Sequence, residues 1–530
     1  MGPVPALEER AEACAERLVA AGEVLLASHI DADGLTSAAI AATALRRAGI
    51  EFETVFKKQL DEAEIASIAA RDEATVLFTD FGSGQLDVIA AHERAGDFTP
   101  VIADHHQPAD AETEYHLNPL LEGIDGASEL SGAGASYVLA RALGEATNGS
   151  LSEERTESAT SREQGDATEG SVTGTRAASE TSLSEQRTES DAPATDGGAV
   201  AAGTDDPTGD NRDLAGLAVV GAVGDMQAVG GELVGANRGV VEEGVEAGVL
   251  AEGTDLAFYG KQTRPLPKLL EYASEVRIPG VSNDQRGAVS FLQGLDLDLK
   301  EGGEWRRWVD LADDERQQVA SALVQHALSR GVPSDRVEDL VATTYTLTAE
   351  DPGTELRDAS EFSTLLNATA RYERADVGLA VCLGDREGAL ERARHLLRTH
   401  RRNLSEGISL IEERGVERAE HVQYFDAGEE IRETIVGIVA GMALGVDGVD
   451  GDRPIVAFAR KSEEETKVSG RGTGRLVGRG LDLSVVMREA ARSVGGDGGG
   501  HDVAAGATIP AGREEEFVAA ADDLVAEQIG

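Results

Sequence analysis

The strongest constraint on the fold is a pattern in the first 110 residues, where short apolar runs alternate with helix-like segments. Residues 23–28 (EVLLAS), 75–79 (TVLFT) and 98–103 (FTPVIA) read as buried strands, and 35–48 (LTSAAIAATALRRA) reads as a helix that ends at Gly49. Strands that alternate with helices at this spacing indicate βαβ units and a parallel sheet. The sequence therefore predicts an α/β fold for the N-terminal part of the chain.

Acidic and imidazole side chains follow apolar runs in four segments: SHIDADG (28–34), FTDFG (78–82), ADHH (103–106) and VGDMQ (223–227). The carboxyl ends of parallel strands meet at one edge of a sheet, where ligand crevices form. The first three segments would bring one group of polar side chains to that edge: His29, Asp31, Asp33, Asp80, Asp104, His105 and His106. The sequence leaves open whether 217–224 is a strand or a helix, and either could bring Asp225 to the same crevice.

So many carboxylates would be costly to bury together without cations. Imidazole and carboxylate without thiolate suit Mn²⁺, Mg²⁺ or Zn²⁺. Two metals about 3.5–4 Å apart hydrolyse phosphate esters in many enzymes. Each segment alone has another interpretation, since DADG is common in turns, Asp80 could cap a helix and DHH could lie in a surface loop. Together, in this order, they predict a two-metal site.

The segments SHIDADGLTS, LFTDFG, IADHHQP and AVVGAVGD resemble the four motifs of the DHH phosphoesterase superfamily. GGDGGGHDVAAG (495–506) resembles the GGGH signature of the DHH-associated domain. With both halves present, the chain most resembles the archaeal RecJ-like single-strand exonucleases, over about 1–255 and 350–530. The first motif begins with His29, where bacterial RecJ proteins have Asp. The metal preference and the polarity of bacterial RecJ proteins are therefore not carried over.

This resemblance implies a role for each residue of the N-terminal site. His29 and Asp31 would hold one metal, and Asp80 would bridge to a second metal held by Asp33, His105 and Asp225. Mn²⁺ is the expected ion and Mg²⁺ the alternative. The catalytic set would be Asp104, His105 and His106, in which Asp104 orients His105 and fixes its tautomer, and His106 faces the scissile phosphate.

The resemblance also implies a phosphate-binding surface in the C-terminal domain. Glycines without Cβ atoms let backbone N–H groups approach a phosphate closely. KVSGRGTGR (467–475) resembles the Ser-x-Arg segment of this domain. The implied substrate-binding residues are Ser469, Arg471, Gly498, Gly499, Gly500 and His501. The locally basic stretch 392–402 could follow the backbone of a nucleic-acid strand or could be a solvated helix face.

Three domains are expected: a DHH phosphoesterase domain (1–255), a mostly helical connecting region (256–350) and a smaller α/β DHH-associated domain (351–530). Residues 145–213 are rich in Ser, Thr, Glu and Gly and lack aromatic residues, so we predict a disordered acidic insert. Further expectations are strands at 376–384 and 454–460, a long helix at 387–415, and packing roles for Trp305 and Trp308.

The composition indicates the solvent conditions and the compartment in which the protein works. The net charge is −49, Lys occurs at only seven positions and aromatic residues make up 4%, a pattern typical of proteins of extreme halophiles. At 1 M salt the Debye length is about 3 Å, so this charge does not exclude nucleic acid. No apolar run reaches a membrane span, no secretion signal is present, and the two Cys suit a reducing cytoplasm.

Three functions remain. The first is a RecJ-like exonuclease that hydrolyses single-stranded DNA or RNA to nucleoside monophosphates, with a role in DNA repair. The second is a small-nucleotide phosphodiesterase acting on oligoribonucleotides or cyclic dinucleotides. The third is a replisome component that docks on the GINS complex. Scaffold relatives tend to lose ligands, and this chain keeps the full set, which favours catalysis.

Overall fold

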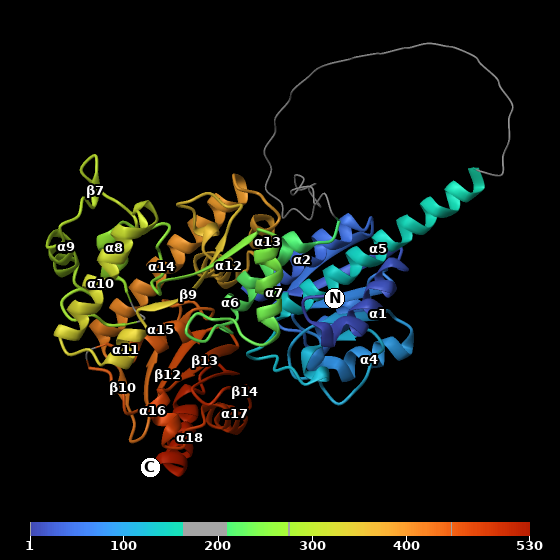
Figure 1. The fold of residues 1–530 in the computed structure, drawn as a ribbon. Coiled ribbons are helices and arrows are strands. Elements are labelled where there is room, and N and C mark those ends of the chain that lie inside the picture. The colour runs from blue at the N-terminus through green and yellow to red at the C-terminus, as the bar shows by residue number, and fades with distance from the viewer. Residues whose placement is uncertain (1, 163–208, 274–275, 447) are drawn as a thin grey trace, which may run out of the picture. The chain divides into compact units, whose positions relative to one another are not determined.

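The computed structural model describes residues 2–162, 209–273, 276–446 and 448–530 (Figure 1). The chain forms two compact units, one comprising Met1–Leu366 and Gly378–Ala389, the other Asn367–Val377 and Leu390–Gly530. Both units are built of helices and a β-sheet, so the predicted α/β class is confirmed. Among the described residues, no helix combines the length and apolarity needed to cross a bilayer. The three-domain division stays a prediction.

The first unit contains a five-stranded sheet whose order is β2-β1-β3-β4-β5 and whose strands all run parallel. Its strands are β1 Glu23–His29, β2 Glu51–Lys57, β3 Thr75–Thr79, β4 Thr99–Ala103 and β5 His116–Leu117. The three strands expected from the sequence are therefore confirmed. β2 and β5 were not predicted, because β2 is half-exposed with alternating acidic residues and β5 has only two residues.

Helices cover both faces of this sheet. α1 (Glu8–Val19), α2 (Ala32–Arg47), α5 (Gly132–Arg162), α6 (Ala215–Gly224) and α7 (Ala236–Glu246) lie on one side. α3 (Glu62–Ala69) and α4 (Leu86–Ala95) pack on the other, against alternate strand residues such as Leu25, Phe78 and Ile102. Buried on both faces, the strands are nearly continuous apolar runs. The open question at 217–224 is answered by α6, which is a helix.

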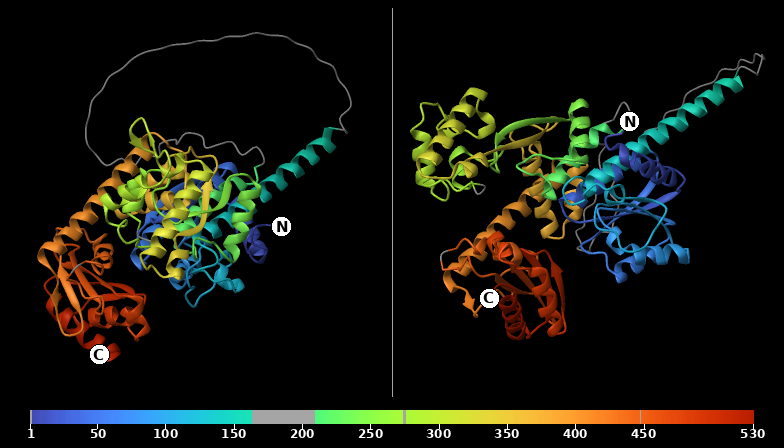
Figure 2. Two further views of the ribbon diagram at one scale, coloured as in Figure 1. Left: turned by 60° about the vertical axis from the view of Figure 1, so that its left-hand side comes forward. Right: turned by 60° about the horizontal axis from the view of Figure 1, so that its bottom comes forward.

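Part of the expected acidic insert is helical. α5 runs to Arg162, well past residue 145, and in the right view of Figure 2 it is the long blue-green helix. Residues 209–214 are also described and contain a short 3₁₀ turn, Arg212–Leu214. The remainder of the predicted disordered insert, 163–208, lies outside the described residues.

The rest of the first unit has its own core. Its elements are β6 (Leu250–Leu256), α8 (Leu266–Glu271), α9 (Gln285–Gln293), β7 (Lys300–Glu301), β8 (Glu304–Trp305), α10 (Asp313–Ser329), α11 (Ser334–Glu338) and β9 (Val341–Leu347). β6 and β9 pair antiparallel and connect the four helices to the parallel-sheet part. Trp308 is buried in this core and Trp305 packs against it, as expected, although neither lies on an α-helix.

The second unit contains a six-stranded mixed sheet of order β10-β11-β12-β13-β15-β14. Its strands are β10 (Glu417–Arg418), β11 (Gln423–Asp426), β12 (Ile455–Arg460), β13 (Glu465–Arg471), β14 (Asp497–Gly500) and β15 (Ala504–Pro510). α15 (Val436–Ala443) packs on one face, and α17 (Leu483–Ser493) and α18 (Glu514–Ile529) pack on the other. α16 (Gly474–Gly478) follows β13, and two helices, α12 (Ala359–Arg371) and α14 (Gly388–Arg414), run from the first unit into the second.

Two predictions for this part are confirmed and one is wrong. The strand at 454–460 is β12 and the long helix at 387–415 is α14. The expected strand at 376–384 is instead a helix, α13 (Ala375–Cys382). Its apolar run, DVGLAVC, is buried around several sides, and in a segment so short a buried helix and a buried strand have the same hydrophobic pattern.

Candidate metal centre

The first two candidate ligands lie where β1 meets α2. His29 is the last residue of β1, and its Nδ1 lies 3.2 Å from Asp31 Oδ2 and 3.4 Å from Asp80 Oδ2. Asp31 is the N-cap of α2, with its Oδ1 accepting a hydrogen bond from the Gly34 N–H at 3.0 Å. One carboxylate oxygen of Asp31 thus stabilises the helix while the other faces His29.

Asp33 lies in the first turn of α2 and is buried. Its carboxylate accepts hydrogen bonds from the N–H groups of Gly132 (2.7 Å) and Ala133 (3.0 Å), at the start of α5. The positive end of the α5 dipole therefore stabilises the charge of Asp33. The N-termini of α2 and α5 thus hold the carboxylates of Asp31 and Asp33, respectively.

Asp80 follows β3 directly and adopts a left-handed backbone conformation, with φ of 61°. Its N–H donates to the Ala103 carbonyl at 3.0 Å, which turns the carboxylate back toward β1 and β4. A Cβ at Gly132 would lie 2.8 Å from the Asp80 Cβ, so a residue larger than glycine does not fit there. Asp80 is buried, yet its Oδ1 has no hydrogen-bond partner in the described part of the chain.

His105 and Asp104 follow β4. His105 Nδ1 lies 2.7 Å from the Gly126 carbonyl, and a proton donated there leaves Nε2 as the ligand atom, 3.3 Å from Asp80 Oδ1 and 3.8 Å from Asp33 Oδ2. The expectation that Asp104 orients the His105 ring is wrong. The Asp104 carboxylate instead accepts from the backbone N–H groups of Ser83 and His105 and contacts Nδ1 of His106 at 2.8 Å.

Asp225 caps the C-terminus of α6, with Oδ2 3.7 Å from the His105 ring. Gln227, which no sequence pattern singled out, holds it in place. Its buried amide donates to Asp225 Oδ2 at 2.9 Å and to the Gly126 carbonyl at 2.8 Å, and accepts from Asn237 at 2.7 Å. Gln227 therefore links Asp225 to the carbonyl that orients His105. The one sequence signal for this role is the position of Gln227 two residues after Asp225 in VGDMQ.

The predicted ligands fall into two groups of three. Potential ligand atoms of His29, Asp31 and Asp80 all lie within 4.8 Å of one another, and so do those of Asp33, His105 and Asp225. Asp80 also approaches the second group through His105. Oxygen and imidazole nitrogen donors of this kind suit Mn²⁺ and Mg²⁺, and Asp80, which contacts His29 and His105, would be shared between the two groups. The residues thus fit a pair of divalent cations.

Protonation in this cluster reflects the crowding of charge. Burial, followed by the charges of Asp80 and Asp225, raises the pKa of Asp33 well above its usual value. Burial also raises the pKa of Asp225, to about 6. Burial would lower the pKa of His29, but Asp31 and Asp80 outweigh it and raise that pKa to about 11. Without a cation, protons neutralise this site, and a bound metal would replace them.

His106 lies at the exposed side of the cluster. Its contact with Asp104 raises the pKa of His106, and burial opposes this only in part. Burial would raise the pKa of Asp104, yet the hydrogen bond with His106 lowers it to about 2. Asp104 therefore favours the protonated form of His106 and contacts only its Nδ1, so the second ring nitrogen is not used by Asp104.

The predicted phosphate-binding residues lie together in the second unit. Ser469 of β13 and Gly499 of β14 both pair with Gly506 of β15, from opposite sides, so the three form one row across the sheet. The predicted residues on these two strands are Ser469, Arg471, Gly498, Gly499 and Gly500, and His501 follows directly. Ser469 and Arg471 both face α15, where a Cβ on Gly437 would overlap the Arg471 guanidinium.

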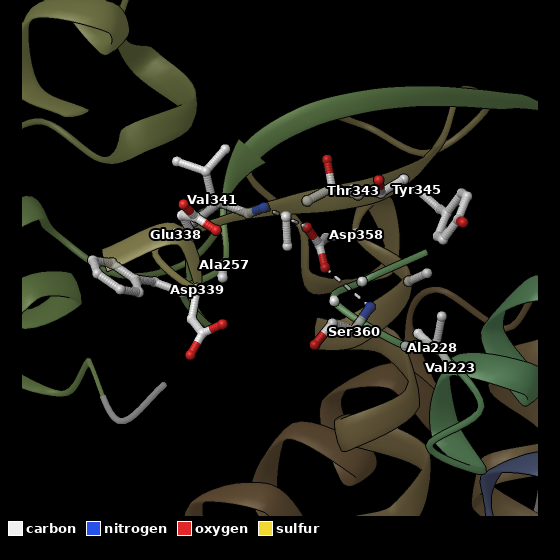
Figure 3. Close-up of a pocket in the computed structure, with 17 residues that line it drawn as sticks. Val223, Ala228, Ala257, Glu338, Asp339, Val341, Thr343, Tyr345, Asp358 and Ser360 are labelled. Carbon is white, nitrogen blue, oxygen red and sulfur yellow. Dashed lines mark hydrogen bonds and ion pairs between the residues drawn. The ribbon is translucent and has the colours of Figure 1, made fainter. Parts of the chain in front are cut away.

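A separate cavity of about 500 Å³ lies beside β9 in the first unit (Figure 3). Val223 and the 228–231 loop contribute to its wall, but none of the candidate metal ligands does. Its one buried cation, Lys261, lies 3.5 Å from Asp358, and Asp358 caps the N-terminus of α12. The lining combines apolar residues with Glu338, Asp339 and Asp358, and the charge of Lys261 is already matched by Asp358.

Three family models match the chain in sequence order. The DHH family, N-terminal domain, matches residues 23–160, the DHH-CID domain matches 258–341 and the DHHA1 domain matches 420–527. Together with the site, these matches show a chain built from DHH, DHH-CID and DHHA1 domains, as in proteins of the DHH superfamily. A Methanocaldococcus jannaschii protein described as uncharacterized is 25% identical over 516 residues, which cover 96% of this chain and 94% of that protein.

Several solved structures are similar to this chain in fold. A manganese-bound exonuclease RecJ is similar with a TM-score of 0.54 and 16% identity, over 99% of this chain and 95% of that one. RecJ of Thermus thermophilus with Mn²⁺ gives 0.55 and 17% over 99% of this chain, which spans about half (55%) of that protein's length. CDC45 from Entamoeba histolytica gives 0.59 and 10%, over 98% and 99%. The fold is therefore RecJ-like.

Proposed function

We propose that the chain is a two-metal phosphodiesterase that degrades single-stranded DNA or RNA from an end to nucleoside monophosphates. The observation that carries this proposal is the pair of three-residue ligand groups that meet at Asp80. His29, Asp31 and Asp80 would hold one ion, and Asp33, His105, Asp225 and again Asp80 the other. The manganese-bound RecJ structures, with a similar fold, support Mn²⁺ as the ion, and Mg²⁺ is the alternative.

Bound divalent cations supply Lewis-acid charge for the phosphoryl oxygens and lower the pKa of water. The side chains of this protein would donate a hydrogen bond, hold the ligands in position and bind the substrate. Asp104 raises the pKa of His106, and in its protonated form the free ring nitrogen of His106 would donate a hydrogen bond to a phosphoryl or leaving oxygen. Gly126 and Gln227 keep His105 and Asp225 in ligand orientation. Ser469, Arg471 and the 498–501 segment would bind the substrate backbone.

The test uses oligomers of single-stranded DNA and RNA, labelled separately at each end, incubated with the full chain in Mn²⁺ and multimolar KCl. Mononucleotide release is expected from the wild type and should be lost in His105→Ala. His92→Ala is the matched control, because His92 also contacts an aspartate, Asp97, but lies away from the site. If long strands survive while dinucleotides or cyclic dinucleotides are cut, the small-nucleotide phosphodiesterase replaces this proposal.

A second candidate function is favoured by the fold likeness to CDC45 over nearly the whole of both chains. A replication-complex component that binds GINS would need no hydrolysis. Absence of hydrolysis on every substrate, together with binding to purified GINS, would favour this role. A protein that hydrolyses strands and also binds GINS would combine both.

A further inference from the structure

An unusual group of arginines lies in the second unit, where acidic partners are otherwise plentiful. The chain has 97 acidic and 48 basic residues, and Arg374, Arg402 and Arg414 of the same region all lie near carboxylates. Within the described residues, no ion pair reaches Arg371, Arg432 or Arg471. Arg371 is the last residue of α12, Arg432 lies shortly before α15 and Arg471 is the last residue of β13.

Their arrangement is fixed by uncharged contacts. The Arg432 guanidinium carbon lies 5.1 Å from the centre of the Tyr372 ring, a cation–π distance. Tyr372 is held by a hydrogen bond from Asn403 of α14 to its hydroxyl (2.8 Å) and by the edge of His400, at 6.2 Å between ring centres. Arg432 is thus positioned without a carboxylate, and its N–H groups stay available to an external anion.

Arg371 continues this cluster toward the predicted phosphate-binding strand. It directly precedes Tyr372, and its charge lies close enough to Arg471 to contribute, after burial, to lowering the pKa of Arg471. Arg471 itself donates only to the carbonyls of Gly470 (2.7 Å) and Ala505 (3.4 Å). Two polar atoms of the same region, Nδ1 of His400 and Oγ1 of Thr434, are buried without a hydrogen-bond partner among the described residues.

Like charges held together without carboxylates indicate that an anion completes the cluster. Guanidinium groups bind phosphate oxygens through paired hydrogen bonds, and they do so better than ammonium groups. We propose that Arg371 and Arg432 bind a backbone phosphate of a single-stranded nucleic acid next to the one bound by Ser469 and Arg471, with Tyr372 as the positioning residue for Arg432. This inference rests on the proposed function, since it assigns further substrate-binding residues to it.

The test measures binding by the full chain without divalent metal, so that no strand is cut. Fluorescence anisotropy with labelled twelve-nucleotide DNA and RNA strands is followed over a series of KCl concentrations. Arg371→Ala/Arg432→Ala should bind about tenfold more weakly. The slope of log Kd against log salt should also fall by about 0.7 for each phosphate that the variant no longer binds. Both arginines are exposed, so the variant is expected to fold.

Arg488→Ala/Arg492→Ala on α17 is the matched control, because it removes the same charge from surface arginines that neighbour Glu489. It should bind as the wild type does. Tyr372→Ala should weaken binding as Arg432→Ala does, whereas Tyr372→Phe, which keeps the ring, should restore it. Tyr372→Ala should also lower the salt slope as Arg432→Ala does, whereas a merely structural Tyr372 would change the affinity without changing the salt slope.

The outcomes separate the two proposals. If the wild type binds and degrades strands while Arg371→Ala/Arg432→Ala binds equally well, the inference is wrong and the proposed function stands. Equal weakening in both double variants would mean that net charge alone is sensed, which also overturns it. If the wild type neither binds nor degrades any strand, the proposed function fails, and this inference fails with it.

Discussion

At the scale of single residues, Asp80 is the side chain on which the candidate centre depends. It is buried, it lies between His29 and His105, and one of its oxygens has no hydrogen-bond partner within the described chain. The imidazoles of His105 and His29 outweigh burial and hold the pKa of Asp80 below its usual value. In the metal-free protein this buried charge is stabilised by the two histidines when they are protonated, and a cation would take the place of those protons.

Asp80→Asn should therefore abolish stabilisation by metal without loosening the metal-free fold. Asn tolerates the left-handed backbone at this position, and removing a carboxylate near Asp33 reduces repulsion. At 100 times the Kd, Mn²⁺ should stabilise the wild type by about 2.7 kcal/mol, and the variant should gain almost nothing. Thermal melting with and without MnCl₂ measures the stabilisation of the wild type and of the variant. Asp97→Asn, at an exposed position, is the control. A variant that keeps the full Mn²⁺ shift would contradict the bridging role.

Glu361 provides a pH-dependent contribution to stability away from the metal centre. Burial raises its pKa to about 7, although the Gln262 N–H (2.8 Å) and the Thr263 hydroxyl (2.7 Å) both donate to the carboxylate. Because the folded pKa exceeds the unfolded one, the native state binds the proton more tightly. The associated stability is present below the unfolded pKa, about 4.5, and is lost as the pH rises through 7.

Glu361→Gln should remove this dependence, since the amide keeps the size and cannot ionise. Between pH 4.5 and 8 the wild type should lose about 3 kcal/mol that the variant does not lose. Urea unfolding at several pH values gives the difference directly, and exposed Glu387→Gln is the control. Parallel pH profiles for wild type and Glu361→Gln would show that Glu361 ionises normally.

That the candidate ligand residues lie close together was predictable, because each follows an apolar run closely and the local sequence therefore indicates both the strand and its polar end. The contacts that hold these side chains in place were not predictable. Asp33 receives its hydrogen bonds from Gly132 and Ala133, about 100 residues away, and Gln227 reaches the Gly126 carbonyl over a similar separation. No local pattern encodes such pairs. Asp104 was assigned to the wrong histidine for the same reason, since Gly126 was already bound to His105.

At the scale of elements, predictions succeeded where a segment had one dominant periodicity. β1, β3 and β4 each have a buried, mostly apolar centre, and α14 repeats its apolar positions at helical spacing over 27 residues. β2 was missed because an edge strand with one half-exposed face resembles a polar loop. α13 was misassigned because a short helix buried on most sides shows no polar face, and only tertiary packing distinguishes it from a strand.

The contact between α15 and β13 allows a second test of the substrate surface at this scale. A Cβ on Gly437 would overlap the Arg471 guanidinium and lie 3.1 Å from Ser469 Oγ. Gly437→Ala should therefore displace both side chains and weaken strand binding about tenfold, while the better helix propensity of Ala offsets part of the packing cost. Strand binding and melting temperature are measured together.

Gly441→Ala, one turn further along α15, is the matched control, because the added Cβ meets Arg471 only at ordinary contact distance, 3.9 Å. It should bind as the wild type does. If Gly437→Ala retains full affinity at unchanged stability, Ser469 and Arg471 do not contact the substrate through this face.

At the scale of the whole molecule, the net charge of −49 is the main electrostatic influence on stability. Some of the acids are placed where they help: Asp313, Asp314 and Glu315 lie in the first turn of α10, and Glu514, Glu515 and Glu516 in the first turn of α18. Negative charge at a helix N-terminus is favourable by about 0.3–1 kcal/mol. These local gains do not remove the repulsion among all the exposed carboxylates, which grows as salt is removed.

We therefore expect the stability of the whole chain to depend on screening, in keeping with the proposed halophilic origin. The Debye length falls from about 10 Å at 0.1 M salt to about 3 Å at 1 M, so the melting temperature should rise most steeply within this interval. Screening depends on ionic strength alone, so KCl and KBr should act alike up to about 1 M and diverge only above it. Sucrose at equal osmolality should not reproduce the steep part. A melting temperature that is flat between 0.1 and 1 M KCl would mean that self-repulsion is already compensated within the fold, and the composition would then no longer argue for a high-salt environment.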